Sequence, residues 1–235
     1  IPGVFRFDGG QGQYGIIWPE KELVISLHEG AFAPLGPQKT LDTLYEHLLL
    51  MLQDEPMPEA PDDLAALCAL EASQALPAGE PSATLPDASW NGTYAMQSGR
   101  FDPWFAVAPP GAGDLFAAFR SPEHDHPIRG FSLAVTHEHL TLTLDSGAEI
   151  RANLDGTLKE RFVASPFPAL GSYAATARLS GQDELELRIR WLNGWFETVL
   201  LFSQQAEGLA ITTKKLRLNE TDNYLIEANF AARQA

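Results

Sequence analysis

Four glycines gather near the start of the chain: Gly9, Gly10, Gly12 and Gly15. Glycine has no Cβ, so a backbone rich in it can come close to a ligand or to another strand. Two interpretations of the cluster are open. The glycines form the wall of a ligand or substrate site, or they serve only the twist and packing of a bulged hairpin.

Two apolar runs that predict strands follow the glycine cluster. An apolar run, Ile16–Trp18, leads into a tight Pro-Glu-Lys turn, and Leu23–Leu27 is a short run rich in β-branched residues. Such runs predict two buried strands joined as a hairpin. The glycines would therefore stand at the start of a strand that is backed by core.

The same stretch resembles a known active-site element. Phe7-Asp8-Gly9-Gly10-Gln11-Gly12-Gln13, then Trp18-Pro19-Glu20 and Leu23-Val24-Ile25, is similar to the third active-site element of the serine β-lactamase and penicillin-binding-protein-like (class C-type) hydrolases. The resemblance implies that this strand flanks a catalytic serine, and that a backbone N–H of residues 9–11 completes the oxyanion hole. The site-facing residues would be Asp8, Gly9, Gly10, Gln11 and Gly12.

The chain departs from that family at three motifs. Phe7-Asp8-Gly9 stands where the family has Lys-Thr-Gly or His-x-Gly, so a penicillin-like preference for carboxylates does not follow. No serine is followed three residues later by lysine, and no tyrosine begins Tyr-x-Asn. The Ser-x-x-Lys nucleophile of the family is therefore absent. We expect this segment alone not to catalyse the reaction of its parent.

The resemblance gives an expected parent. We expect the C-terminal part of a longer bacterial serine hydrolase that cleaves a peptide, amide or ester through an acyl-serine. Its partners would be the missing N-terminal catalytic domain and the small-molecule or peptide substrate of the parent. No cofactor is expected. The compartment stays undetermined by the sequence.

Four histidines form the only candidate for a metal site: His124, His126, His137 and His139. On a strand, residues i and i+2 share a face, so His-x-His can grip one metal ion. Against this, the first pair sits in a Pro-bounded polar loop and the second falls where a hairpin turn is expected. Surface turn histidines are the preferred interpretation.

Composition excludes several classes of function. The 235 residues carry a net charge of −15, which would repel phosphate backbones, so nucleic-acid binding is not expected. The longest purely apolar runs are only a few residues, so no membrane span is expected. The single cysteine, Cys68, excludes an internal disulfide and lies in an Ala/Leu-rich segment where we expect it to be buried.

The pattern along the chain predicts three parts. Residues 1–53 are expected to be two antiparallel strands plus a helix of a β-lactamase-like domain, the helix presenting Leu41, Leu44, Tyr45 and Leu48 on one face. Residues 54–88 read as a linker with a short helix. Residues 89–235 show period-2 alternation, clearest in Leu140–Leu144 and Leu185–Trp191, and hairpin turn signals at Asp145-Ser146-Gly147 and Asn193-Gly194. Both features favour an all-β antiparallel barrel or sandwich. This last part resembles the β-rich, lipocalin-like accessory domain of the same family.

A second hypothesis needs no enzyme. The chain could be a non-catalytic β-barrel module for binding or interaction, with an apolar ligand near Trp104, Trp191 or Trp195. Ordinary barrel core and a patch that docks on the catalytic domain are the other interpretations of these aromatic residues.

Overall fold

The computed structural model describes residues 2–9, 12–29, 36–53, 55, 58–74, 79, 81, 84–104, 127–166, 170–181, 183–194, 196–217 and 224–232. The chain divides into two compact units, Ile1–Ala75 and Leu76–Ala235. We call them the N-terminal unit and the C-terminal unit and describe each by itself.

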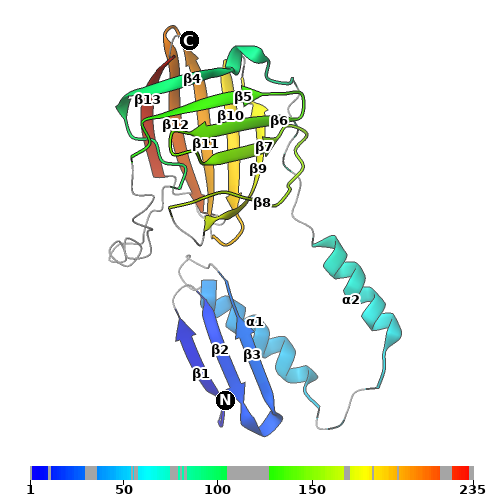
Figure 1. Cartoon of the computed structure of the whole chain (residues 1–235). Coiled ribbons are helices and arrows are strands. Elements are labelled where there is room, and N and C mark those ends of the chain that lie inside the picture. Colours follow the sequence, from blue (N-terminus) through cyan, green and yellow to red (C-terminus); the bar gives the residue numbers. More distant parts are fainter. Residues whose placement is uncertain are drawn as a thin grey trace. The chain divides into compact units, whose positions relative to one another are not determined.

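The N-terminal unit contains a three-stranded antiparallel sheet in the order β1-β2-β3 (Figure 1). Its strands are β1 (Phe5–Gly9), β2 (Gln13–Trp18) and β3 (Leu23–Leu27), and the short 3-10 helix η1 (Pro19–Lys21) joins the last two. The prediction of two strands was one short. The extra strand, β1, ends at Gly9, the first glycine of the cluster, and its residues pair with β2 from Phe5 opposite Ile17 to Gly9 opposite Gln13.

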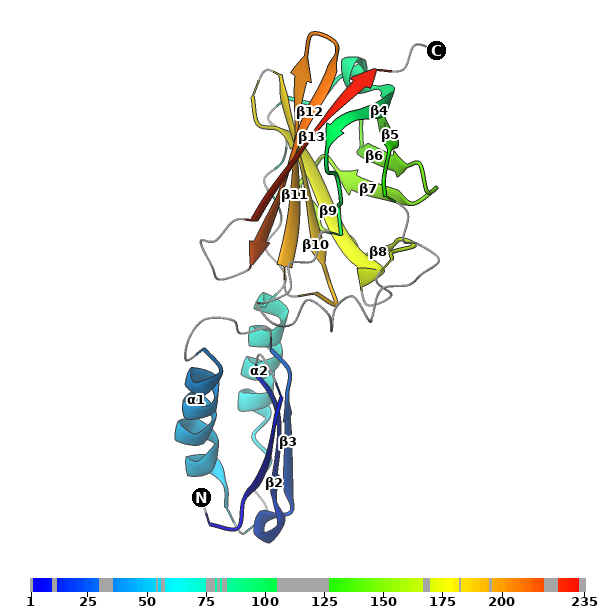
Figure 2. The ribbon, with the colours of Figure 1, turned by 90° about the vertical axis from the view of Figure 1, so that its left-hand side faces the viewer.

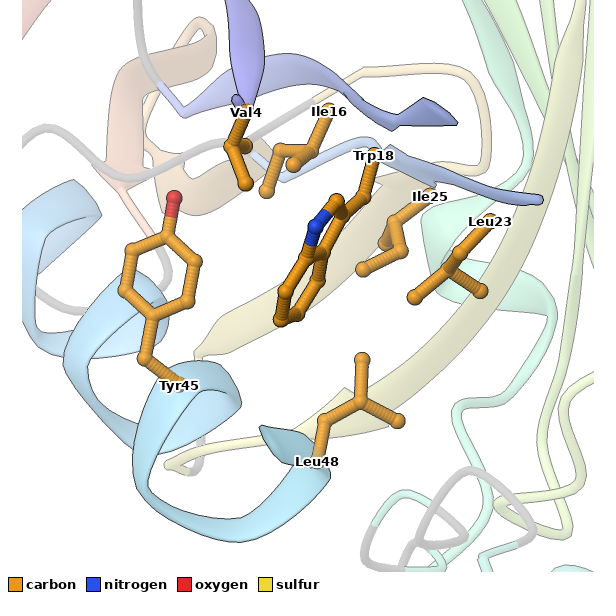
Figure 3. A pocket seen from close by; sticks show the side chains of 7 residues that line it. All are labelled: Val4, Ile16, Trp18, Leu23, Ile25, Tyr45 and Leu48. Atoms are coloured by element: carbon orange, nitrogen blue, oxygen red, sulfur yellow. The ribbon is translucent and has the colours of Figure 1, made fainter. Parts of the chain in front are cut away.

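Helix α1 (Gly36–Met51) covers one face of this sheet (Figure 2). Leu41 is buried and Leu44, Tyr45 and Leu48 are half-buried, which confirms the predicted apolar face. Between helix and sheet lies a small apolar pocket (Figure 3). It is lined by Val4, Ile16, Trp18, Leu23, Ile25, Tyr45 and Leu48.

The second predicted helix, α2 (Pro61–Ser73), forms as well, and every one of its residues is exposed. The prediction that Cys68 is buried was therefore wrong. An Ala/Leu composition supports a helix by propensity, but it does not by itself supply a surface to pack against. No helix in the described part of the chain is long and apolar enough to cross a membrane.

The C-terminal unit is a β-barrel of nine strands with one short extra strand (Figure 1). The short 3-10 helix η2 (Ala88–Trp90) precedes it. Its strands are β4 (Gly92–Gly99), β5 (Gly130–Val135), β6 (His139–Leu144), β7 (Glu149–Asn153), β8 (Arg161–Phe162), β9 (Ser172–Leu179), β10 (Glu184–Trp191), β11 (Phe196–Gln205), β12 (Gly208–Arg217) and β13 (Tyr224–Ala232).

The ring runs β10-β11-β12-β13-β4-β5-β6-β7-β9 and closes where β9 pairs with β10. Strand β8 pairs on the outside with the start of β9. The expected all-antiparallel sheet was wrong at one junction, because β7 and β9 pair in parallel through Asn153 and Thr176. A barrel and a sandwich were both predicted. The pairing of β9 with β10 closes the sheet into a barrel, which has no pair of open edges.

Alternation along the strands fills the barrel. Strand β10 buries every second residue, as the sequence predicts, and Leu185, Leu187, Ile189 and Trp191 are each no more than 1% exposed. At one place the core is aromatic: the Phe131 ring stacks on Tyr94 with 5.1 Å between centroids. Desolvation raises the pKa of the Tyr94 hydroxyl above its usual value, as expected for a phenol held among apolar groups.

Candidate functional site

One face of the N-terminal sheet has no covering layer among the described residues. Successive side chains of a strand point to opposite faces, and Phe5, Phe7 and Val24 all lie on the face opposite α1. These three side chains are 63%, 67% and 71% exposed. Phe5 pairs with Ile17, and Ile17 pairs with Val24, so an apolar row crosses all three strands. We call this surface the open face.

The predicted site residues divide between the two faces. Asp8 lies on the side of α1, where its carboxylate accepts a hydrogen bond from Arg6 at 2.8 Å. That contact, together with Tyr45 of α1, raises the pKa of the Arg6 guanidinium. Arg6 also stands 5.5 Å from the centroid of the Tyr14 ring. Gly9, one residue on, belongs to the open face, so Asp8 and Gly9 point in opposite directions.

Two glycines at this end of the sheet leave little room for a side chain. A Cβ on Gly9 would lie 2.9 Å from the Cβ of Gln13, its cross-strand partner. Gly12 adopts a φ of +89°, and a Cβ there would lie 2.2 Å from the side chain of Glu29. Both positions therefore favour glycine, and the atoms that a Cβ would meet belong to Gln13 and Glu29 of the same hairpin. Gly10 and Gln11 lie outside the described residues.

Next to these glycines, hydrogen bonds connect the ends of β2 and β3. The Gln13 amide nitrogen donates to the Glu29 backbone carbonyl at 2.5 Å, and its amide oxygen meets His28 Nδ1 at 2.8 Å. The other ring nitrogen of His28, Nε2, lies 2.9 Å from the Ser26 hydroxyl. Ser26 and His28 are exposed on the open face, and Gln13 is half-buried. We call Gln13, Ser26 and His28 the polar relay.

The carboxylate of Glu29 completes the support of this end of the sheet. One of its oxygens accepts a hydrogen bond from the Thr40 hydroxyl of α1 at 2.7 Å, and the other is buried with no partner in the described part of the chain. Because the same side chain lies against Gly12, Glu29 joins the glycine segment to the helix. Contacts from the sheet and from helix α1 therefore both hold the glycine end of the site in place.

Of the two histidine pairs, only His137 and His139 lie in the part of the chain that the structure describes. His137 and His139 flank the β5–β6 turn, as predicted, and their Nε2 atoms lie 3.4 Å and 3.7 Å from the Glu138 carboxylate. His124 and His126 lie outside the described residues. Within the described part of the chain, no three His, Cys, Asp or Glu side chains stand close enough to hold a metal ion.

Sequence reasoning did not single out the polar relay. Ser26 and His28 have the i, i+2 spacing that places two side chains on one face of a strand, which is a visible signal. The contribution of Gln13 has no local signal, because it depends on the register that pairs Tyr14 with Leu27.

Comparison with known proteins does not extend this assignment. No protein-family model matches the chain, and no curated protein matches it. The function is therefore inferred from the residues of this chain.

Proposed function

We propose that the chain is the C-terminal segment of a β-lactamase-related serine hydrolase. In this proposal β1 is the oxyanion-side strand of the catalytic domain, Gly9 and its neighbours offer backbone N–H groups to the substrate, and the barrel is an accessory domain. The parent would form an acyl-serine from a peptide, amide or ester and then hydrolyse it. The nucleophile would come from the polypeptide that completes the catalytic domain.

The observation that carries the proposal is the open face. A sheet covered by α1 on one side and exposing Phe5, Phe7 and Val24 on the other has only half of its layers. Burying Phe5 and Val24 is worth on the order of 2–4 kcal/mol, which favours a covering layer. The occupant we propose is the remainder of the catalytic domain, packed on the apolar row of Phe5, Ile17 and Val24. The glycine end would then stay open to substrate.

The test begins with the coding sequence upstream of Ile1. We expect it to encode Ser-x-x-Lys and Tyr-x-Asn, and the extended polypeptide to hydrolyse esters at that serine. Replacing Gly9 by valine in the extended polypeptide should then lower turnover by about 100-fold, because the strand that carries the oxyanion donor is displaced. Steady-state ester hydrolysis measures this effect.

A matched control is available in the barrel. A Cβ on Gly181 would lie 3.6 Å from its nearest neighbour, so Gly181→Val introduces the same residue without a close contact and should leave turnover unchanged. If no such motifs are encoded, or if Gly9→Val is as active as Gly181→Val, the proposal is wrong.

A second candidate function, a binding module, is favoured by two polar atoms of the barrel. Trp104 and Thr213 are 3% and 1% exposed, yet Trp104 Nε1 and Thr213 Oγ1 have no hydrogen-bond partner among the described residues. A buried donor without a partner costs about 1–3 kcal/mol. An apolar ligand with an oxygen acceptor would satisfy the Trp104 N–H where Trp104 packs on Trp191, with 6.3 Å between ring centroids.

Titration with dodecanoate tests this candidate. We expect a saturable change in tryptophan fluorescence that Trp104→Phe abolishes, because phenylalanine keeps an aromatic ring but has no N–H donor. Trp18→Phe, in the N-terminal unit, should leave the titration unchanged. A flat titration, or one that Trp104→Phe does not alter, would contradict a ligand at this place.

A further inference from the structure

The polar relay has the order of groups that activates a hydroxyl. A nucleophilic serine needs a base within hydrogen-bond distance, and the base needs a third group that orients it. Ser26 Oγ and His28 Nε2 are 2.9 Å apart, and His28 Nδ1 and Gln13 Oε1 are 2.8 Å apart. Each separation is that of a hydrogen bond in such an arrangement.

The direction of each hydrogen bond follows from the Gln13 amide. Its nitrogen donates to the Glu29 carbonyl, which can only accept, so its oxygen must be the atom that faces His28. That oxygen accepts only, and therefore Nδ1 of His28 carries the ring proton. In the neutral imidazole Nε2 is then left with a lone pair, and the Ser26 hydroxyl donates to it. This is the tautomer that a general base requires.

We propose that Ser26 is a nucleophile for acyl transfer, with His28 as its general base and Gln13 as the positioning residue for the imidazole. Its oxygen bonds to the carbonyl carbon of an ester while its proton passes to His28 Nε2. The bond to the leaving oxygen breaks, and His28 returns the proton to that oxygen. Water then attacks the acyl-serine, gives a proton through His28 back to Ser26, and releases the carboxylic acid.

The surroundings of Ser26 indicate the class of substrate. Its cross-strand neighbour is Gly15, which presents no side chain, so the hydroxyl is accessible from the open face. The Phe7 ring lies beside Gly15, with Cδ2 3.5 Å from where a Cβ would be, and Phe7 is 67% exposed. An aryl or alkyl ester could pack its apolar part on this ring. An activated ester fits best, because it needs the least help with its leaving group.

This chemistry is independent of the proposed function. The serine of the parent hydrolase would lie in another polypeptide segment, whereas Ser26, His28 and Gln13 all belong to this chain. The two proposals can therefore fail separately, because each is tested by the reactivity of a different serine.

The test uses the 235-residue chain and a fluorophosphonate probe, followed by peptide mass mapping. The Ser26 oxygen would bond to phosphorus as fluoride leaves, and His28 would take the proton. Ser98 is the internal reference, since it is an exposed strand serine whose hydroxyl meets only the Asn229 amide, at 3.2 Å. We expect Ser26 to be labelled about 100-fold faster than Ser98, the lower range of what a positioned base contributes.

Variants separate the roles. His28→Asn, with an unchanged circular dichroism spectrum, should reduce labelling of Ser26 to the rate of Ser98. Gln13→Leu should do the same, while Gln13→Glu restores labelling, because a carboxylate oxygen can still accept from Nδ1. If the only role of Gln13 were to donate a hydrogen bond to the Glu29 carbonyl, Gln13→Leu and Gln13→Glu would reduce the labelling of Ser26 equally.

The comparison of Ser26 with Ser98 needs no variant, so a misfolded mutant cannot leave the question open. Equal labelling rates at the two serines in the unaltered chain would overturn the proposal. Faster labelling of Ser26 that persists in His28→Asn would equally overturn the assigned base.

Discussion

Replacing Phe131 by alanine is expected to lower the free energy of unfolding of the barrel by about 3–5 kcal/mol. The Phe131 ring stands among four other aromatic rings, with centroid distances of 5.1 Å to Tyr94, 5.6 Å to Phe101, 5.9 Å to Phe202 and 4.8 Å to Phe230. These rings come from β4, the segment after it, β11 and β13. Truncation therefore leaves a cavity lined by distant parts of the chain, which cannot all move to fill it.

Urea denaturation followed by tryptophan fluorescence measures this loss. Phe162→Ala is the matched control, because that side chain is 77% exposed and its removal should change stability by less than about 0.5 kcal/mol. An equal effect of the two substitutions would contradict the assignment of Phe131 to the centre of the core.

Replacing Gly99 by alanine is expected to cost about 3 kcal/mol or more of barrel stability. Gly99 has a φ of +86°, a conformation that strains any residue with a Cβ. In addition, the new Cβ would stand 2.1 Å from the Glu227 carbonyl oxygen and 2.7 Å from the Ala228 Cα. Both atoms are backbone of the paired strand β13, so the contact can be relieved only by moving the strand.

The control for Gly99 isolates the backbone strain. Gly147 has nearly the same φ, +85°, but a Cβ there would have nothing within 4 Å. Gly147→Ala should therefore cost only about 1–2 kcal/mol, the strain of the left-handed conformation. Thermal unfolding measures the loss of stability in each variant. The difference between the two losses is the contribution of the steric clash with β13. Equal losses would show that β13 does not approach Gly99 this closely.

Local patterns were enough for the elements whose signal lies within a few residues. The alternation of Leu140–Leu144 and Leu185–Trp191 predicted strands with one buried face, and β6 and β10 confirm it. Asp145-Ser146-Gly147 predicted a turn, and Gly147 N–H bonds to the Leu144 carbonyl there. The helix α1 was likewise visible in its 3.6-residue apolar spacing.

Contacts between distant segments were not visible in the sequence. Glu197 illustrates the reason. It lies on the polar, outward side of β11, yet it is only 4% exposed, because Arg188 and Arg190 of β10 hold its carboxylate at 2.9 Å and 2.6 Å. Alternation predicts the side of the sheet on which a residue lies, but the partner it meets depends on the register of the neighbouring strand.

The candidate site shows the same division. Consecutive residues were enough to predict a sheet beside the glycine cluster, an apolar face on α1 and an all-β last part. Only the folded chain shows that β1 is a third strand, that Phe5, Phe7 and Val24 share an uncovered face, and that Gln13 meets His28. Periodicity is a property of consecutive residues, whereas strand order, register and closure depend on contacts between residues far apart in the chain.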